Sequence, residues 1–237
     1  MDPIPREPSC PTNPPTIRDP PMNLSTDGLT GRFIVLEGGE GAGKTSLIAA
    51  LETVLTADGH TVRRTREPGG SPSAEKIRAI VVSGSIDSLD AAAETLLFTA
   101  ARRQHLRETI LPALRRGEIV LCDRYLGSTL AYQGLRGVPE EDILDLHRRF
   151  CGGLRPHLTL VLDIPPEIGL ARSGRRLAAD GSGEGRFEQM DLDAHRKIRA
   201  AYLANAARDP DCHVVLDATQ TPEQVLANAL AALKARI

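Results

Sequence analysis

Residues 33–45 read FIVLEGGEGAGKT, an apolar run that leads directly into a glycine-rich turn. The run 33–36 is typical of a strand that is buried on both faces of a sheet. The turn 38–45 matches G-x-x-x-x-G-K-[ST], and apolar residues at helical spacing follow it, which is the context that confirms this motif. The stretch therefore predicts a nucleoside triphosphate site between a strand and a helix.

The turn offers the groups that a triphosphate needs. Its glycines allow successive backbone N–H groups and the helix N-terminus to face a phosphate. Lys44 is expected to reach the β- and γ-phosphates, and Thr45 to ligate Mg²⁺. The predicted nucleotide-binding set is the whole loop: Gly38, Gly39, Glu40, Gly41, Ala42, Gly43, Lys44 and Thr45.

The rest of the chain alternates between strand and helix patterns. Further strands are expected at 61–65, 119–122, 158–162 and 213–216, and further helices around 74–82, 90–116, 140–150, 167–178, 191–207 and 222–235. This order predicts an α/β fold of three layers, in which a five-stranded parallel sheet is flanked by helices. Ligands of such a sheet bind at the carboxyl ends of its strands.

The composition limits the partners. The sequence has 29 basic and 31 acidic residues, so no overall positive field favours a nucleic acid polymer. No apolar run approaches the roughly 18 residues that span a bilayer. Scattered cysteines without metal-binding spacing are typical of a reducing compartment. We expect a cytoplasmic protein with a small-molecule ligand and no membrane contact.

Two further segments carry arginines after predicted strands. Arg124 follows Asp123 where a strand should end, and a guanidinium there can form a fork onto a second anionic substrate, while Asp123 can hold a magnesium-bound water. A plain surface ion pair is the alternative. Arg66 begins the turn after the second strand. No Asn-Lys pair exists to read guanine, and no acidic pair follows the strand, which disfavours a GTPase and a motor ATPase.

Phe98 and Arg102 are four residues apart and therefore share one face of a predicted helix. Phe98 could stack on a base while Arg102 bonds its carbonyl, or Phe98 could pack in the core. The pattern alone leaves both alternatives open.

Six blocks in order across residues 32–233 resemble bacterial thymidylate kinase, a family of P-loop nucleoside monophosphate kinases: FIVLEGGEGAGKTS, TREPGG, LLFTAARRQH, LCDRYLGSTLAYQG, RPHLTLVLDIPPEIGLAR and GRFEQ. The resemblance implies transfer of the γ-phosphoryl group of ATP to dTMP with Mg²⁺, giving dTDP for dTTP biosynthesis, by a homodimer. Another nucleoside monophosphate kinase, or a P-loop ATPase without a nucleotide acceptor, is the alternative.

The resemblance also implies roles for individual residues. Phe98 would stack on thymine and Arg102 would bind its carbonyl. Glu40, which would be costly if it were desolvated against the phosphates, would instead accept a hydrogen bond from the 3′-hydroxyl of dTMP and face Arg124; an ion pair that only holds the loop is the alternative. The other implied dTMP contacts are Arg66, Arg124, Ser128, Thr129, Tyr132 and Gln133.

The resemblance further implies a flexible lid at about 172–188 within a catalytic P-loop domain at 31–237. Some family members carry an arginine at the position of Gly41, whereas this sequence is similar to the type with lid-borne arginines. The candidates are Arg172, Arg175, Arg176 and Arg186, with Glu188 to orient one of them. Arg176 and Arg186 are the predicted catalytic pair beside Lys44 and Arg124.

Residues 1–30 are rich in proline and are expected to form a disordered tail. Met22 follows the last Pro-Pro pair, so an overlong start assignment and a functional extension both remain open.

Overall fold

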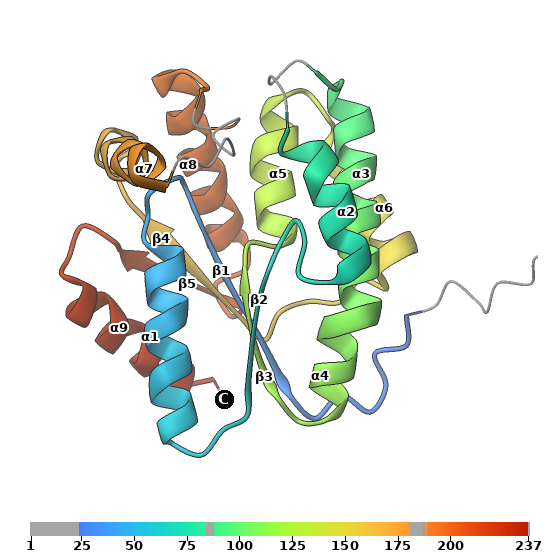
Figure 1. Cartoon of the computed structure of the whole chain (residues 1–237), viewed down its shortest axis with the longest axis vertical. Helices are drawn as coiled ribbons and strands as arrows, with labels where there is room; N and C mark the ends of the chain where they lie inside the picture. The colour runs from blue at the N-terminus through green and yellow to red at the C-terminus, as the bar shows by residue number, and fades with distance from the viewer. Residues whose placement is uncertain (1–23, 84–87, 181–186, 188, 237) are drawn as a thin grey trace, which may run out of the picture.

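A computed structural model of the chain describes residues 24–83, 88–180, 187 and 189–236, with only the backbone described at 175–180 (Figure 1). Its centre is a five-stranded sheet in the order β2-β3-β1-β4-β5. All neighbouring strands are parallel, as the alternation of patterns predicted. The strands are β1 (Arg32–Gly38), β2 (Val62–Arg66), β3 (Ile119–Asp123), β4 (Leu158–Asp163) and β5 (His213–Asp217).

Helices cover both faces of this sheet (Figure 1). A π-helical segment, η1 (Leu106–Ile110), joins α3 to α4, so the helix expected at 90–116 is one continuous helical stretch of three segments. The α-helices are α1 (Lys44–Ala57), α2 (Pro72–Val81), α3 (Ala91–His105), α4 (Leu111–Arg115), α5 (Leu126–Leu135), α6 (Glu140–Cys151), α7 (Pro166–Asp180), α8 (Leu192–Arg208) and α9 (Pro222–Lys234).

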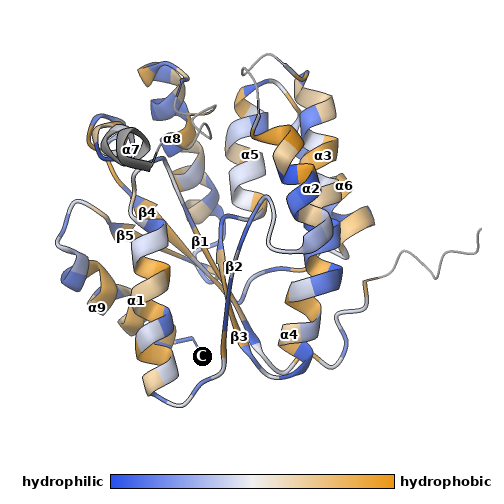
Figure 2. Ribbon diagram, viewed as in Figure 1, coloured by the Kyte–Doolittle hydropathy of each residue, from blue (hydrophilic) through white to orange (hydrophobic). Residues whose placement is uncertain are grey.

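The core has two sides because successive side chains of a strand point to opposite faces. Ile34 and Leu36 of β1 pack with α1 and α9, whereas Phe33 and Val35 pack with η1, α4 and α6. All four side chains are buried, which explains why residues 33–36 are all apolar rather than apolar at every second position. Figure 2 accordingly shows the central strands largely in the orange of hydrophobic residues.

Helix α5 was absent from the sequence-based expectations. Tyr125 precedes it without a side-chain cap, and Gly127 and Gly134 lower its intrinsic helix propensity. Its N-terminus is capped from elsewhere, since the Glu37 carboxylate on β1 accepts the backbone N–H groups of Tyr125 and Ser128 at 2.9 and 3.1 Å. A helix that depends on a distant cap leaves no local signal.

Part of the expected tail lies against the domain. Leu24 and Leu29 pack on the cluster around η1 and α4, and Thr30 donates its N–H to the Leu114 carbonyl at 3.2 Å. Residues 1–23 lie outside the described part. Among the described residues, no helix combines the length and apolar character that crossing a membrane requires.

Candidate active site

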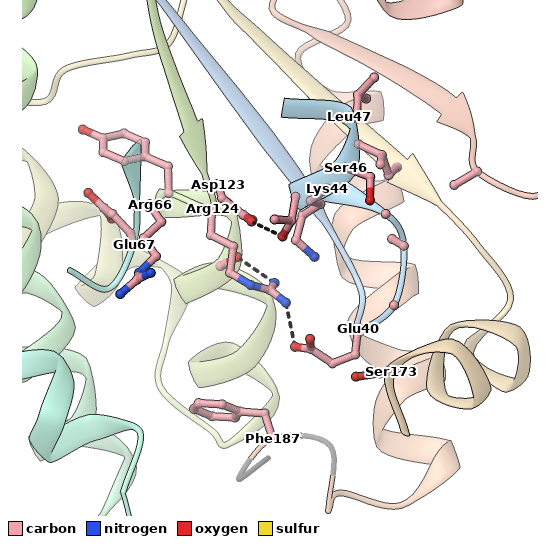
Figure 3. Close-up of a pocket in the computed structure, with 18 of the residues that line it drawn as sticks. Glu40, Lys44, Ser46, Leu47, Arg66, Glu67, Asp123, Arg124, Ser173 and Phe187 are labelled. Atoms are coloured by element: carbon pink, nitrogen blue, oxygen red, sulfur yellow. Dashed lines mark hydrogen bonds and ion pairs between the residues drawn. The ribbon is translucent and has the colours of Figure 1, made fainter. Parts of the chain in front are cut away.

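A cavity of about 810 Å³ opens at the carboxyl ends of the strands (Figure 3). The register of the strands explains which segments form the walls of the cavity. Leu36 of β1 pairs with Asp123 of β3, and Asp123 pairs with Arg66 of β2. The segments that follow these three strands therefore meet at one edge. Of the predicted site residues, the cavity is lined by Glu40, Gly41, Ala42, Gly43, Lys44, Thr45, Arg66, Phe98, Arg102, Asp123, Arg124, Ser128, Thr129, Tyr132 and Gln133.

The loop between β1 and α1 wraps around one lysine. Lys44 Nζ donates to the carbonyl oxygens of Gly38 and Gly39 at 3.0 and 2.9 Å, and these two glycines line a separate cavity of about 20 Å³ behind the loop. Burial, followed by the charge of Arg124, lowers the pKa of Lys44 to about 8. A bound polyphosphate would favour the charged ammonium and raise this pKa again.

Thr45 and Asp123 offer oxygen ligands beside the loop. Thr45 Oγ1 donates to Asp123 Oδ2 at 3.2 Å, while Asp123 Oδ1 is buried without a hydrogen-bond partner among the described residues. No cluster of three or more histidine, cysteine or acidic residues that could hold a metal occurs in that part of the chain. Mg²⁺ typically binds through one or two protein oxygens, water and substrate phosphates, so these two residues fit it.

Glu40 turns away from the loop interior and faces Arg124. Its Oε1 accepts hydrogen bonds from Arg124 Nη2 at 2.6 Å and from the Tyr132 hydroxyl at 2.8 Å (Figure 3). Burial alone would raise the pKa of Glu40, but Arg124 and Lys44 outweigh it and lower the pKa to about 2. Glu40 is therefore a carboxylate whenever the site is folded near neutral pH.

Arg124 adopts an unusual backbone conformation. Its φ of 68° is the only positive φ of a non-glycine residue in the described ranges. For a bulky side chain this conformation is an outlier that surrounding contacts must hold in place. Its Nη1 donates to the Gly38 carbonyl at 3.1 Å, to Ser128 Oγ at 3.3 Å and to the Tyr202 hydroxyl at 3.1 Å.

Glu37 and Tyr202 complete this network, and the sequence reasoning missed both. Glu37 Oε2 accepts a 2.6 Å hydrogen bond from Ser128 Oγ, which lies 2.8 Å from the Tyr202 hydroxyl. Glu37 is 2% exposed, and burial raises its pKa. An acidic residue at the end of an apolar strand was the signal that could have identified Glu37.

The opposite wall holds a buried arginine. Arg102 Nε donates to Glu67 Oε2 at 2.7 Å, its Nη2 donates to Thr129 Oγ1 at 2.8 Å, and its Cζ lies 5.0 Å from the centroid of the Tyr125 ring. Gln133 Nε2 donates a hydrogen bond to Glu94 Oε1 at 2.7 Å. These contacts fix the orientation of both polar groups before any ligand binds.

Phe98 is half-buried on α3. Its side chain lines the cavity and belongs to none of the described core clusters. Its ring centroid lies 6.5 Å from that of Phe187, which in turn lies 5.3 Å from that of Tyr132. Phe187 was not predicted as a site residue, because it sits beside the glycine-rich segment whose local sequence gives no structural signal.

The remaining predicted residues differ in their placement. Arg66 lines the cavity but pairs with Glu75, with Nη2 3.3 Å from the carboxylate. Arg172 of α7 donates its Nη1 to the Ala218 carbonyl at 3.1 Å. The side chains of Arg175 and Arg176, and all of Arg186 and Glu188, lie outside the described residues.

A lysine-bearing glycine loop after the first strand of a parallel sheet places the chain among the P-loop nucleotide-binding proteins. A family model for thymidylate kinase matches residues 36–229. The chain belongs to the thymidylate kinase family. It is therefore a phosphotransferase that uses a nucleotide phosphoryl donor and a small nucleotide substrate.

Several curated relatives cover most of the chain. A thymidylate kinase of Cereibacter sphaeroides is 53% identical over 207 residues, which are 87% of this chain and 95% of the relative. One of Bradyrhizobium sp. is 50% identical over 82% of this chain and 86% of the relative, and one of Halalkalibacterium halodurans is 44% identical over 87% and 98%.

Proposed function

We propose that this chain transfers the γ-phosphoryl group of ATP to dTMP with Mg²⁺, giving ADP and dTDP for dTTP biosynthesis. One observation carries the proposal: the phosphate loop lines the same cavity as the Phe98 ring and the buried Arg102. Glu40 and Arg124 line this cavity as well. A site with two nucleotide-binding ends and a cation between them suits transfer from one phosphate to another.

The ATP end uses the loop. Backbone N–H groups and Lys44 bind the β- and γ-phosphates. Ala218, Gln220 and Pro222, which lie between β5 and the start of α9, also line the cavity. Thr45 and Asp123 would hold Mg²⁺, which neutralises charge on the phosphates when it is bound.

The dTMP end uses the opposite wall. Phe98 stacks on thymine, while Arg102 bonds a thymine carbonyl from a position fixed by Glu67 and Thr129. Gln133 and Tyr132 border the nucleoside. In this structure Glu40 accepts hydrogen bonds from Tyr132 and Arg124. When the acceptor phosphate binds Arg124, it competes with Glu40 for the guanidinium, and the Glu40 carboxylate can then accept from the 3′-hydroxyl.

The reaction needs little covalent assistance. The acceptor is already an anionic oxygen, so no strong general base is required. Arg124 and Arg66 bring this anion toward the loop, and Lys44 stabilises charge on the transferring group. Arg176 or Arg186 of the proposed lid would add a cation there, and closure of the lid would exclude water as a competing acceptor.

A coupled assay of ADP formation with dTMP, dCMP, AMP and GMP tests this proposal. We expect dTMP to be the preferred acceptor, with little ADP formed in its absence. Preference for another monophosphate would assign a different kinase, and rapid ATP hydrolysis that ignores dTMP would assign an ATPase.

We also propose a homodimer. Ile80 on α2 and Leu96 on α3 are 53% and 55% exposed, and the two helices pack together, so their outer surfaces offer apolar area to a second copy. Light scattering coupled to gel filtration would give the mass of a single chain if this is wrong. The cytoplasmic location stays a prediction.

A further inference from the structure

Two glycines bring α7 into direct contact with the phosphate loop. A Cβ atom built on Gly169 would lie 2.3 Å from the carbonyl oxygen of Glu40. One built on Gly41 would lie 1.9 Å from the carbonyl oxygen of Gly169. Real Cβ atoms essentially never come this close to other atoms, and the obstructing atoms belong to the backbone. The helix therefore rests on the loop at the residue whose carboxylate faces Arg124.

Glycine at this place in a helix requires a reason, because it costs about 0.5–1 kcal/mol relative to alanine. Gly169 is not among the residues with a positive φ, and its N–H donates to the Pro165 carbonyl at 3.1 Å as in an ordinary helix. Its backbone conformation is thus open to any residue. What glycine provides here is close approach to Glu40.

Helix α7 also contacts the other walls of the cavity. Arg172 donates to the Ala218 carbonyl at 3.1 Å, and Ser173 lines the cavity together with Glu40 (Figure 3). Near its start, Glu167 pairs with Arg196 of α8 at 2.6 Å. The helix thus connects the acceptor side of the loop, the β5–α9 side of the cavity and the chain that leads into the proposed lid.

We infer that Gly169 is a positioning residue, whose contact with the loop sets the Glu40 carboxylate and the lid-bearing helix relative to one another. A methyl group at position 169 must displace either α7 or the Glu40 peptide. A misplacement of about 1 Å in a reacting constellation can cost on the order of 10²-fold in rate. The inference rests on the proposed function, since it assigns Glu40 to the acceptor.

Three glycine-to-alanine variants test it. Gly169→Ala carries the steric conflict. Gly134→Ala, in α5, adds a methyl group with nothing within 4 Å, and Gly174→Ala adds one to α7 itself with no described atom within that distance. Steady-state kinetics with dTMP and thermal unfolding would be measured for each variant.

We expect Gly169→Ala to raise the KM for dTMP about tenfold and to lower kcat/KM by on the order of 10²-fold. Gly134→Ala should stay within about twofold of the unmodified chain, and Gly174→Ala should lose far less than Gly169→Ala.

Three results would overturn the inference: unchanged kinetics of Gly169→Ala, an equal loss in Gly174→Ala, which would indicate stiffening of the helix, or a lower melting temperature with an unchanged KM. If the unmodified chain does not phosphorylate dTMP, the proposed function fails instead.

Discussion

Glu40 Oε1 lies 2.6 Å from Arg124 Nη2, and the pair joins the phosphate loop to the end of β3. Both side chains are mostly buried, at 14% and 17% exposed, so the charge of each stabilises the other with little screening by water. The ion pair keeps Arg124 aimed into the cavity although its backbone is strained. An acceptor phosphate at Arg124 would compete with Glu40 and leave this carboxylate available for a sugar hydroxyl.

Glu40→Gln keeps the size of this side chain and removes its charge. We expect the variant to lose most of the preference for dTMP over 3′-deoxy-dTMP, because a hydrogen bond to a charged group contributes about 1.5–3 kcal/mol, or roughly 10- to 100-fold. The measurement is kcat/KM for both acceptors. If both proteins discriminate equally, Glu40 only holds the loop through its ion pair.

Arg124→Ala should affect the acceptor far more than ATP. Removing the guanidinium leaves Glu40 unpaired and takes away the cation for the acceptor phosphate, so we expect dTMP phosphorylation to fall by on the order of 10²-fold or more. ATP binding, measured by calorimetry, should change much less. Arg155→Ala, which removes an exposed guanidinium that pairs with Asp209, is the control. Equal losses of ATP affinity and turnover would contradict the assigned role.

The pKa of Lys44 predicts a pH dependence of nucleotide binding. Lys44 loses its proton near pH 8 in the folded chain, so a triphosphate that binds at pH 9 must return that proton. Calorimetry in buffers of different ionisation enthalpy should therefore detect proton uptake at pH 9. The uptake should vanish in Lys44→Arg, because a guanidinium keeps its proton. If proton uptake at pH 9 persists in Lys44→Arg, the proton is taken up by a group other than Lys44.

The same pKa predicts how stability changes with pH. An unfolded Lys44 holds its proton up to its ordinary pKa of 10.5, whereas the folded one releases it from about 8. Between these values the unfolded chain binds more protons, so the Lys44 contribution to the free energy of unfolding rises with pH. Lys44→Met should remove this rise, as measured by urea unfolding at pH 8 and 10. A contribution that falls with pH would contradict the assignment.

The sequence predicts those parts that depend on local pattern. The apolar strands, the glycine loop and the arginine after β3 can each be recognised from a few consecutive residues. In the structure the loop and Arg124 meet at the carboxyl ends of β1 and β3. The missed parts depend on contacts between distant segments. Glu37 caps α5 through backbone N–H groups that lie 88 and 91 residues away in the sequence. Position 169 requires glycine because the Glu40 carbonyl oxygen leaves no room for a Cβ atom. No local periodicity encodes either contact.

Phe98→Ala distinguishes the two roles that the sequence leaves open for this ring, namely stacking on a base and packing in the core. If Phe98 stacks on thymine, its removal should raise the KM for dTMP by roughly 5- to 150-fold, since stacking of a base on an aromatic ring contributes about 1–3 kcal/mol. If Phe98 is a core residue, its removal should instead lower the free energy of unfolding by about 3–5 kcal/mol.

The position of Phe98 favours the first outcome, because its half-buried ring lines the cavity and belongs to none of the described core clusters. Phe150→Ala is the matched control, since Phe150 is also half-buried on a helix but does not line the cavity. It should leave the KM for dTMP unchanged. A similar rise in KM for both variants would show that loss of packing, rather than loss of stacking, weakens acceptor binding.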